Sequence, residues 1–357
     1  MKVGIISLAP GHNFGGILQL YALQEFLIKH GHEVIVFDRQ RNISDENIGS
    51  LAYNFICRKL LYRNINSFVK KHLRITNPIR SDQQLKKLAA DCDAVIVGSD
   101  QVWRLSMVKK IETNFFLDFV PEQCTKIAYS ASFGTNKWEG TDAMTNRIIP
   151  LIKRFKAISI RESDGIDICH NIFNVDAIQT LDPVLLHSTD FYINHLLQKK
   201  GQINDSGLFY YFLANSPLHK KAIDSIAKTL NLRPYTVNYD WKFKIGKFEF
   251  SHCPLPNLWV DAIRKSKFVI TDSFHGVAFS ILFRKPFIVV SNALGGMSRI
   301  ESILSTFHLQ SRLVNFEQIQ DLSSNELLTI DFNQLMEILS IEKKKSMQFI
   351  FSTLQEK

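Results

Sequence analysis

The chain has 357 residues, 45% hydrophobic and 22% charged, which is enough apolar sequence for more than one hydrophobic core. Its net charge of +9 favours anionic partners, but without zinc-finger spacing or an aromatic RNA-binding signature we expect no nucleic-acid partner. The five cysteines are odd in number and lack C-x-x-C pairing, which argues against disulfides and zinc and for a reducing cytoplasm. No apolar run approaches the ~20 residues of a membrane-spanning helix.

The amino-terminal residues predict a strand, a turn, a helix and a second strand. Val3 to Leu8 is an apolar run, and Ile17 to His30 carries apolar residues at helical spacing before Gly31 ends the helix. Glu33 to Phe37 is the second strand, and Asp38 follows it. This order is typical of the opening of a Rossmann-like domain.

The turn between the first strand and helix reads PGHNFGG. Its glycines do not match the G-x-G-x-x-G fingerprint, so binding of NAD is a weak hypothesis and no cofactor is expected. One interpretation is a tight turn that needs glycine. The other is that His12, Asn13 and Gly15 lie at a ligand-facing edge.

Residues 43–78 interrupt the α/β pattern with a helical, basic insertion. Two interpretations stay open. The insertion could rest on a membrane surface or bind a phosphorylated acceptor. It could equally be a helical cover over its own domain, with solvated lysines and arginines.

Three further strands each end in a compact turn of small, polar or charged residues. The strands are Ala94 to Gly98, Ile127 to Ser130 and Ala157 to Ile160. Because parallel strands end at a common edge of the sheet, these turns predict a ligand site there. The turn residues are Ser99, Asp100, Gln101, Trp103, Ser132, Phe133, Arg161 and Glu162. Two alternatives stay open, a structural ion pair between Arg161 and Glu162 and a core position for Trp103.

We place a domain boundary at 183–206, where the pattern pauses. The predicted first domain covers residues 1–185, the second covers 186–330, and a helix within 331–357 packs back across the domains. The second domain is again Rossmann-like. Its predicted elements are strands at 208–213, 233–237, 268–270 and 286–290, helices at 218–230, 255–265 and 298–307, and a loop at 241–251.

Residues 268–290 predict a compact strand, turn, helix and strand. Asp272 or Ser273 can cap the helix, while Phe274, His275 and Gly276 lie at its start, where free N–H groups favour an anion. Farther along, Arg299 follows a glycine loop and lies in the first turn of a helix. A cation is disfavoured there unless an anion is nearby, so we assign Arg299 to anion binding.

Six segments, in order, resemble the polysaccharide pyruvyl transferase family. They are HNFGGILQLYALQ (12–24), VGSDQVW (97–103), YSASFG (129–134), SIRE (159–162), LDPVLL (181–186) and ITDSFHGVAFSILFRKPFI (270–288). The resemblance implies an α/β fold of two Rossmann-like domains in a GT-B-like arrangement with an interdomain cleft. It also implies transfer of pyruvate from phosphoenolpyruvate to two hydroxyls of a sugar, forming a cyclic ketal and releasing phosphate. The implied acceptor is a surface glycan or its lipid-linked precursor.

By this resemblance the second domain holds phosphoenolpyruvate and the first presents the acceptor. A phosphate and a carboxylate need helix N-termini and arginines, which the helix at Ser273, Arg299 and Arg161 offer. His275 is the candidate general acid or phosphate ligand. Asp272 could orient it or cap the helix. The candidates for an acceptor-side base are Asp100, Glu162 and His12, with Asp100 slightly preferred because it lies beside Trp103.

Two other functions stay open on the same residues. A nucleotide-sugar glycosyltransferase would use the phosphate-suited turn for a diphosphate, and a catalytically idle glycan- or lipid-binding protein would keep the fold alone. A lipid-linked acceptor would bring a cytoplasmic protein into peripheral contact with the inner membrane.

Overall fold

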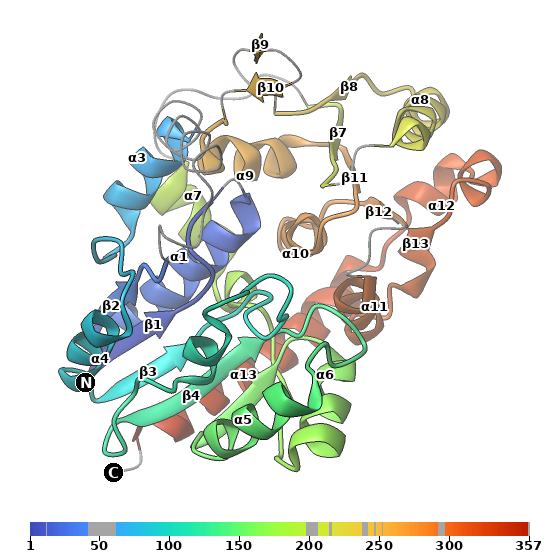
Figure 1. Cartoon of the computed structure of the whole chain (residues 1–357). Coiled ribbons are helices and arrows are strands. Elements are labelled where there is room, and N and C mark those ends of the chain that lie inside the picture. Colours follow the sequence, from blue (N-terminus) through green and yellow to red (C-terminus); the bar gives the residue numbers. More distant parts are fainter. Residues whose placement is uncertain are drawn as a thin grey trace. The chain divides into compact units, whose positions relative to one another are not determined.

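The computed structural model describes the chain except for residues 12, 42–61, 198–205, 214–215, 238–241, 246–247, 252, 292–296 and 356–357. The chain divides into two compact units (Figure 1). Unit 1 comprises Met1–Leu186, Asp240–Cys253 and Lys343–Lys357, and unit 2 comprises His187–Tyr239 and Pro254–Glu342. Among the described residues, no helix is both long and apolar enough to cross a membrane.

Unit 1 alternates strands and helices. Its strands are β1 (Lys2–Ile6), β2 (Glu33–Phe37), β3 (Ala94–Val97), β4 (Thr125–Ala131), β5 (Ala157–Ile160) and β6 (Ile178–Gln179), with a hairpin of β9 (Lys242–Ile245) and β10 (Phe248–Ser251). Its α-helices are α1 (Phe14–Lys29), α3 (Arg63–His72), α4 (Asp82–Ala90), α5 (Asp142–Ile152) and α6 (Ser163–Ile168). Shorter turns of helix are η3 (Glu112–Phe116), η4 (Cys169–Phe173) and η5 (Pro183–Leu186).

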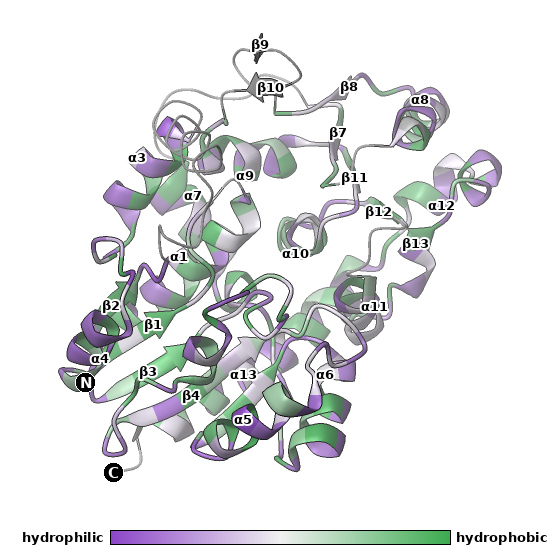
Figure 2. Ribbon diagram, viewed as in Figure 1, coloured by the Kyte–Doolittle hydropathy of each residue, from purple (hydrophilic) through white to green (hydrophobic). Residues whose placement is uncertain are grey.

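The main sheet of unit 1 is parallel throughout, in the order β2-β1-β3-β4-β5-β6. Its central strands are continuous apolar runs such as AVIV in β3, as expected for strands covered on both faces. Figure 2 shows the hydrophobic colour along β1 and β3. Because β2 lies on one side of β1 and β3 on the other, the chain reverses its direction of progress between β1 and β3. Ligands bind at such a switch point in open α/β sheets.

An aromatic cluster fills part of the unit 1 core. The Trp103 ring is 1% exposed and stacks on Phe116 with ring centroids 5.2 Å apart. It also contacts Phe133, and its indole N–H donates to the carbonyl of Phe115. A buried tryptophan whose N–H is satisfied stabilises the core through its large apolar area. The core alternative for Trp103 is therefore the one the structure supports.

Unit 2 is also α/β, with a parallel sheet in the order β13-β12-β11-β7-β8. Its strands are β7 (Leu208–Tyr211), β8 (Pro234–Tyr235), β11 (Phe268–Thr271), β12 (Phe287–Val290) and β13 (Leu313–Val314). Its helices are α7 (Thr189–Leu196), α8 (Pro217–Leu230), α9 (Pro256–Lys265), α10 (Phe274–Leu282), α11 (Met297–Thr306), η6 (Gln310–Arg312), η7 (Gln318–Asp321), α12 (Ser324–Leu328) and the part of α13 (Phe332–Gln355) up to Glu342. The switch point of this sheet lies between β7 and β11.

The predicted fold class, α/β with two Rossmann-like domains, is confirmed by the two parallel sheets. The predicted loop at 241–251 is wrong, because these residues contain the antiparallel hairpin β9–β10. This hairpin belongs to unit 1 although it lies within the chain of unit 2, and Asn64 Nδ2 donates to the Cys253 carbonyl at 3.2 Å. The sequence does carry a signal for the hairpin, because KFKI and FEFS both alternate apolar and polar residues on either side of a Gly-Lys dipeptide.

The carboxyl end of α13 packs within unit 1. Ser346 Oγ accepts a hydrogen bond from the Leu181 N–H at 2.9 Å, and Lys156 Nζ donates to the Thr353 carbonyl at 3.0 Å. Ser346 is fully buried. These contacts attach the end of the chain to the segment that precedes the boundary between the units.

Candidate functional site

A cavity of about 390 Å³ lies at the carboxyl edge of the unit 1 sheet. The loops after β1, β2 and β3 all line it, so it occupies the switch point of the sheet. Its polar lining residues include Asn13, Arg39, Gln40, Arg41 and Asp100. Its apolar lining residues include Leu8, Pro10, Val108, Ile111 and Phe115. Apolar walls with a few convergent polar groups are typical of ligand sites.

Asp100 is the acidic side chain that lines this cavity. Its φ of 93° lies outside the usual range for a residue with a side chain, and it is 3% exposed. Its Oδ1 atom accepts a hydrogen bond from the Gln101 N–H at 2.8 Å, and its carbonyl accepts from Val102 and Ser132. Backbone strain of this kind often occurs at functional sites, where surrounding contacts enforce it.

Gly16 lets helix α1 approach the Asp100 carboxylate. A Cβ atom at residue 16 would lie 2.9 Å from Asp100 Oδ2, closer than real Cβ contacts. Asn13 caps the helix, since its Oδ1 accepts from the N–H groups of Gly15 at 3.0 Å and Gly16 at 3.4 Å. The glycine-rich turn therefore combines a helix cap with a close approach to a carboxylate. His12 lies outside the described residues.

Arg39 follows β2 and closes another part of the cavity. Its Nε donates to Asn114 Oδ1 at 2.6 Å and its Nη2 to Asp82 Oδ1 at 3.0 Å. Burial lowers the pKa of Arg39, while the Asp82 carboxylate opposes that change. Because its donors already have protein partners, Arg39 positions the loops around the cavity.

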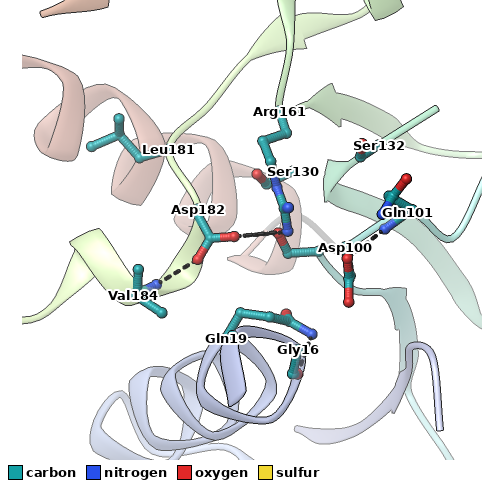
Figure 3. Close-up of polar contacts among 12 residues, drawn as sticks. Gly16, Gln19, Asp100, Gln101, Ser130, Ser132, Arg161, Leu181, Asp182 and Val184 are labelled. Carbon is teal, nitrogen blue, oxygen red and sulfur yellow. Dashed lines mark hydrogen bonds and ion pairs between the residues drawn. The ribbon is translucent and has the colours of Figure 1, made fainter. Parts of the chain in front are cut away.

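An ion pair between Arg161 and Asp182 lies near the same sheet edge (Figure 3). Arg161 Nη2 is 2.7 Å from Asp182 Oδ2, and both side chains are at most 1% exposed. Ser99 joins them, because its Oγ donates to Asp182 Oδ2 at 2.9 Å and accepts from Arg161. Asp182 is thus an ion-pair partner of Arg161, and the alternative of an ion pair between Arg161 and Glu162 stays a prediction. The catalytic role of Arg161 stays a prediction.

Gln19 and Ser7 extend this network into α1 and β1. Gln19 Nε2 donates to Ser7 Oγ at 3.1 Å and to the Gly16 carbonyl at 2.9 Å. Ser7 Oγ in turn donates to the Ser99 carbonyl, which fixes the orientation of the Gln19 amide. Gln19 Oε1 is buried without a hydrogen-bond partner among the described residues. A water or ligand hydroxyl could donate to it.

Glu162 holds the turn after β4. Its Oε1 accepts from Ser132 Oγ at 3.0 Å, from the Phe133 N–H at 2.7 Å and from the Gly134 N–H at 3.1 Å. The nearby carboxylate and, to a larger extent, burial raise the pKa of the Cys169 thiol to about 12. A carboxylate with three such donors is suited to organising a turn, and the role of Glu162 as the acceptor-side base stays a prediction. Ser132, Phe133 and Glu162 are fully buried, so substrate contact by them stays a prediction.

In unit 2 the corresponding edge is built around Asp272. Its Oδ1 accepts a hydrogen bond from the Leu213 N–H at 2.6 Å, which joins the ends of β11 and β7. Thr271 Oγ1 donates to the Tyr211 carbonyl and accepts from the Ser273 N–H. Side-chain hydrogen bonds therefore connect the ends of the two strands that meet at the switch point of this sheet. Asp272 does not cap the helix, since that position belongs to Ser273.

Helix α10 begins directly after these residues in the sequence. Ser273 Oγ accepts from the Gly276 N–H at 3.4 Å and caps the helix. His275 is 4% exposed and meets Phe274 edge to face, with ring centroids 5.2 Å apart. A Cβ at Gly276 would lie 2.5 Å from Thr271 Oγ1, so glycine permits the helix to begin against β11. Arg299 lies in the first turn of α11, as predicted.

The structure also identifies site residues that the sequence alone did not. Gly16, Arg39 and Gln40 line the unit 1 cavity, and Asp182 pairs with Arg161. For the buried polar network around Asp182, the sequence contained one signal: Gln19 is a polar residue within an otherwise apolar stretch of helix α1. Among the described residues, no group of three or more His, Cys, Asp or Glu side chains could hold a metal ion.

The comparisons with solved structures identify the fold. Arabidopsis thaliana UGT89C1 complexed with UDP-L-rhamnose matches with a TM-score of 0.54, 10% identity and coverage of 98% of each chain. The glycotransferase of kitacinnamycin matches with a TM-score of 0.53, 10% identity and 99% of each chain. At such identities the likeness shows the fold alone, which is that of GT-B glycosyltransferases. No curated protein matches.

The family model for polysaccharide pyruvyl transferase matches residues 13–293. That range includes the turn at Asn13, the polar strand ends of unit 1 and the start of α10 in unit 2. The match confirms the family resemblance seen in the six sequence segments. The chain belongs to the polysaccharide pyruvyl transferase family of transferases.

Proposed function

We propose that the chain transfers pyruvate from phosphoenolpyruvate to a sugar of a surface glycan or its lipid-linked precursor, forming a cyclic ketal and releasing phosphate. The observation that carries this proposal is the start of α10. There a buried histidine lies in the first turn of a capped helix at the switch point of a parallel sheet. Such a position combines N–H groups that favour an anion with a side chain able to transfer a proton.

The proposed reaction begins with proton transfer to the methylene carbon of phosphoenolpyruvate. As that C–H bond forms, C2 becomes electrophilic and the first sugar hydroxyl attacks it, losing its proton to a base. The second hydroxyl then forms a C–O bond at C2 while the C2–O bond to phosphate breaks, and the proton of this hydroxyl passes to the departing phosphate. The products are the ketal, whose methyl group holds the added proton, and inorganic phosphate. In this scheme His275 is the acid or a phosphate ligand, and Arg299 binds an anionic group.

For the base, the geometry favours Asp100 over Glu162. Asp100 lines a cavity and its Oδ1 accepts from the Gln101 N–H, whereas Glu162 Oε1 accepts three hydrogen bonds and Glu162 does not line that cavity. The acceptor sugar would occupy the unit 1 cavity, with Asn13 and Gln101 near its edge. Trp103 would support this site from the core, because both its burial and its stacking leave no face for a sugar.

The test measures phosphate release from phosphoenolpyruvate with candidate glycan acceptors, together with mass spectrometry of the acid-labile product. His275→Asn removes the imidazole and should lower kcat by ~10²- to 10⁴-fold if the histidine is the acid. If His275 instead binds phosphate, Kd for phosphoenolpyruvate should rise. His195→Asn, at an exposed histidine of unit 2, is the matched control and should change neither value.

Thermal shifts separate this proposal from the alternatives. Stabilisation by UDP- or GDP-sugars, without stabilisation by phosphoenolpyruvate, would instead identify a nucleotide-sugar glycosyltransferase. Binding of a glycan with no turnover of either donor would identify an idle binding protein.

A further inference from the structure

Helix α3 has one buried face and one cationic face. Ile65, Phe68 and Val69 are buried and attach the helix to unit 1. Arg63, Lys70 and Lys71 are exposed, and their spacing places them on the opposite side of the helix. Figure 2 shows both hydrophilic and hydrophobic residues along α3. Arg74, just beyond the helix, is exposed as well.

The positive charge of the chain is concentrated around this helix. Residues 47–81 contain seven lysines and arginines and no aspartate or glutamate, so this stretch accounts for seven of the nine net charges. The remainder of the chain is therefore almost neutral. Such concentration distinguishes the segment from the ordinary mixed-charge surface of a globular protein.

The exposed cations are not neutralised by neighbouring side chains. Within the part of the chain that the structure describes, Arg63, Lys70, Lys71 and Arg74 take part in no ion pair. By contrast, Arg39 and Arg154 each have a carboxylate partner. Four unpaired cations in a short segment create a local positive potential that attracts an anionic surface.

This cationic segment is also tied to the edge of the unit 1 cavity. The Arg74 carbonyl accepts from the Val36 N–H at 2.9 Å, which attaches the end of α3 to strand β2. Farther along, Arg80 Nη2 donates to Gln40 Oε1 at 3.2 Å, and Gln40 lines the cavity. The charged segment and the cavity therefore belong to one continuous part of unit 1.

We infer that this α3 face, formed by Arg63, Lys70, Lys71 and Arg74, docks on an anionic phospholipid bilayer. Charge complementarity supports the bilayer, because each basic residue near an anionic membrane adds about 1 kcal/mol, or roughly fivefold in affinity. The exposed positions between the cations are Asn66 and Ser67, with no exposed aromatic ring for stacking on a nucleic-acid base. Docking of this face on a bilayer does not depend on the transferase activity of the chain.

Vesicle co-sedimentation of the full chain tests this inference without any substrate. Vesicles of phosphatidylcholine with phosphatidylglycerol should bind the protein, while phosphatidylcholine alone should not, and binding should weaken as salt rises. Lys70→Gln with Lys71→Gln should lower the affinity by roughly 25-fold. The matched control is Lys220→Gln with Lys221→Gln, because these are also adjacent, exposed helical lysines and the change in net charge is identical. The control should bind like the unchanged protein.

An equal loss in both double variants would overturn the inference, since net charge alone would then explain binding. Absence of binding to the anionic vesicles would overturn it too. Tighter binding to duplex DNA or a soluble acidic polysaccharide than to vesicles, again lost on changing Lys70 and Lys71, would assign the face to a different partner. Phosphate release is measured separately with a water-soluble acceptor. A failed transferase assay and a failed docking assay are thus distinguishable.

Discussion

Asp100 and Gly16 are in such close contact that the Asp100 Oδ2 atom lies 2.9 Å from the position that a Cβ atom of residue 16 would occupy. Gly16→Ala should therefore displace the carboxylate and, if Asp100 is the base, reduce kcat by on the order of 10- to 100-fold, because a reacting group is then moved by a fraction of an ångström or more. Thermal stability should change little, because alanine favours the helix that residue 16 belongs to.

Gly11→Ala is the matched control for this substitution. Gly11 lines the same cavity, but a Cβ there would lie 3.9 Å from the Ala9 carbonyl oxygen, an ordinary van der Waals contact. Its turnover should remain close to that of the unchanged protein. Equal turnover of both variants would mean that the position of the Asp100 carboxylate does not matter for the reaction.

Asp100→Asn should lower kcat by ~10²- to 10⁴-fold if this carboxylate is the base. Asparagine is similar in size and tolerates positive φ, so the strained backbone and the melting temperature should be retained. Steady-state phosphate release and circular dichroism measure the two effects. Asp91→Asn, at an exposed position in unit 1, should leave both unchanged, and full activity of Asp100→Asn would assign the base elsewhere.

Asp182→Ala should destabilise the protein by about 3–5 kcal/mol, because it leaves the Arg161 guanidinium buried without its carboxylate. Urea unfolding measures the loss. Glu122 is 79% exposed and forms an ion pair with Arg154. Glu122→Ala removes this carboxylate and should lower the free energy of unfolding by about 0–1 kcal/mol. Similar losses in the two variants would contradict a structural role for the buried pair.

His72 should make the protein less stable in mild acid. Burial, and to a smaller extent Lys71, lower the pKa of His72 in the folded chain. The unfolded chain therefore binds more protons as pH falls through its ordinary pKa of ~6.5, and the free energy of unfolding decreases with falling pH. His72→Gln should flatten the stability profile between about pH 7 and 5. An unchanged slope would show that other groups cause the acid sensitivity.

The buried cysteines should resist alkylation in the folded protein. Burial raises the pKa of Cys92 and Cys124 to about 11 and that of Cys253 to about 12, so little reactive thiolate is present at pH 8. Cys57 lies outside the described residues, so the measurement uses a Cys57→Ser background. Iodoacetamide should label this variant only after denaturation. Rapid labelling of the native variant would show that the thiols are accessible.

The local pattern of the sequence determined most of the fold. Strands such as β2 and β5, and helices such as α10, follow from apolar runs and helical spacing, since each depends on neighbouring residues. The polar strand ends likewise predicted a site at the sheet edge, because all parallel strands of a sheet end on the same side. The six short segments, which occur in the same order as in the polysaccharide pyruvyl transferase family, also predicted the family to which the chain belongs.

Only the tertiary structure decided which side chains meet. Asp100 contacts Gly16 because β3 lies beside β1 in the sheet, and Arg161 pairs with Asp182 because the strand β6, which Asp182 follows, pairs in parallel with β5. Neither relationship has a sequence spacing that predicts it. Packing between distant segments also decides that Trp103 is buried and that the hairpin segment 240–253 belongs to unit 1. Such contacts depend on the packing of segments distant in the chain, whereas hydrophobic periodicity reports only which face of one segment is buried.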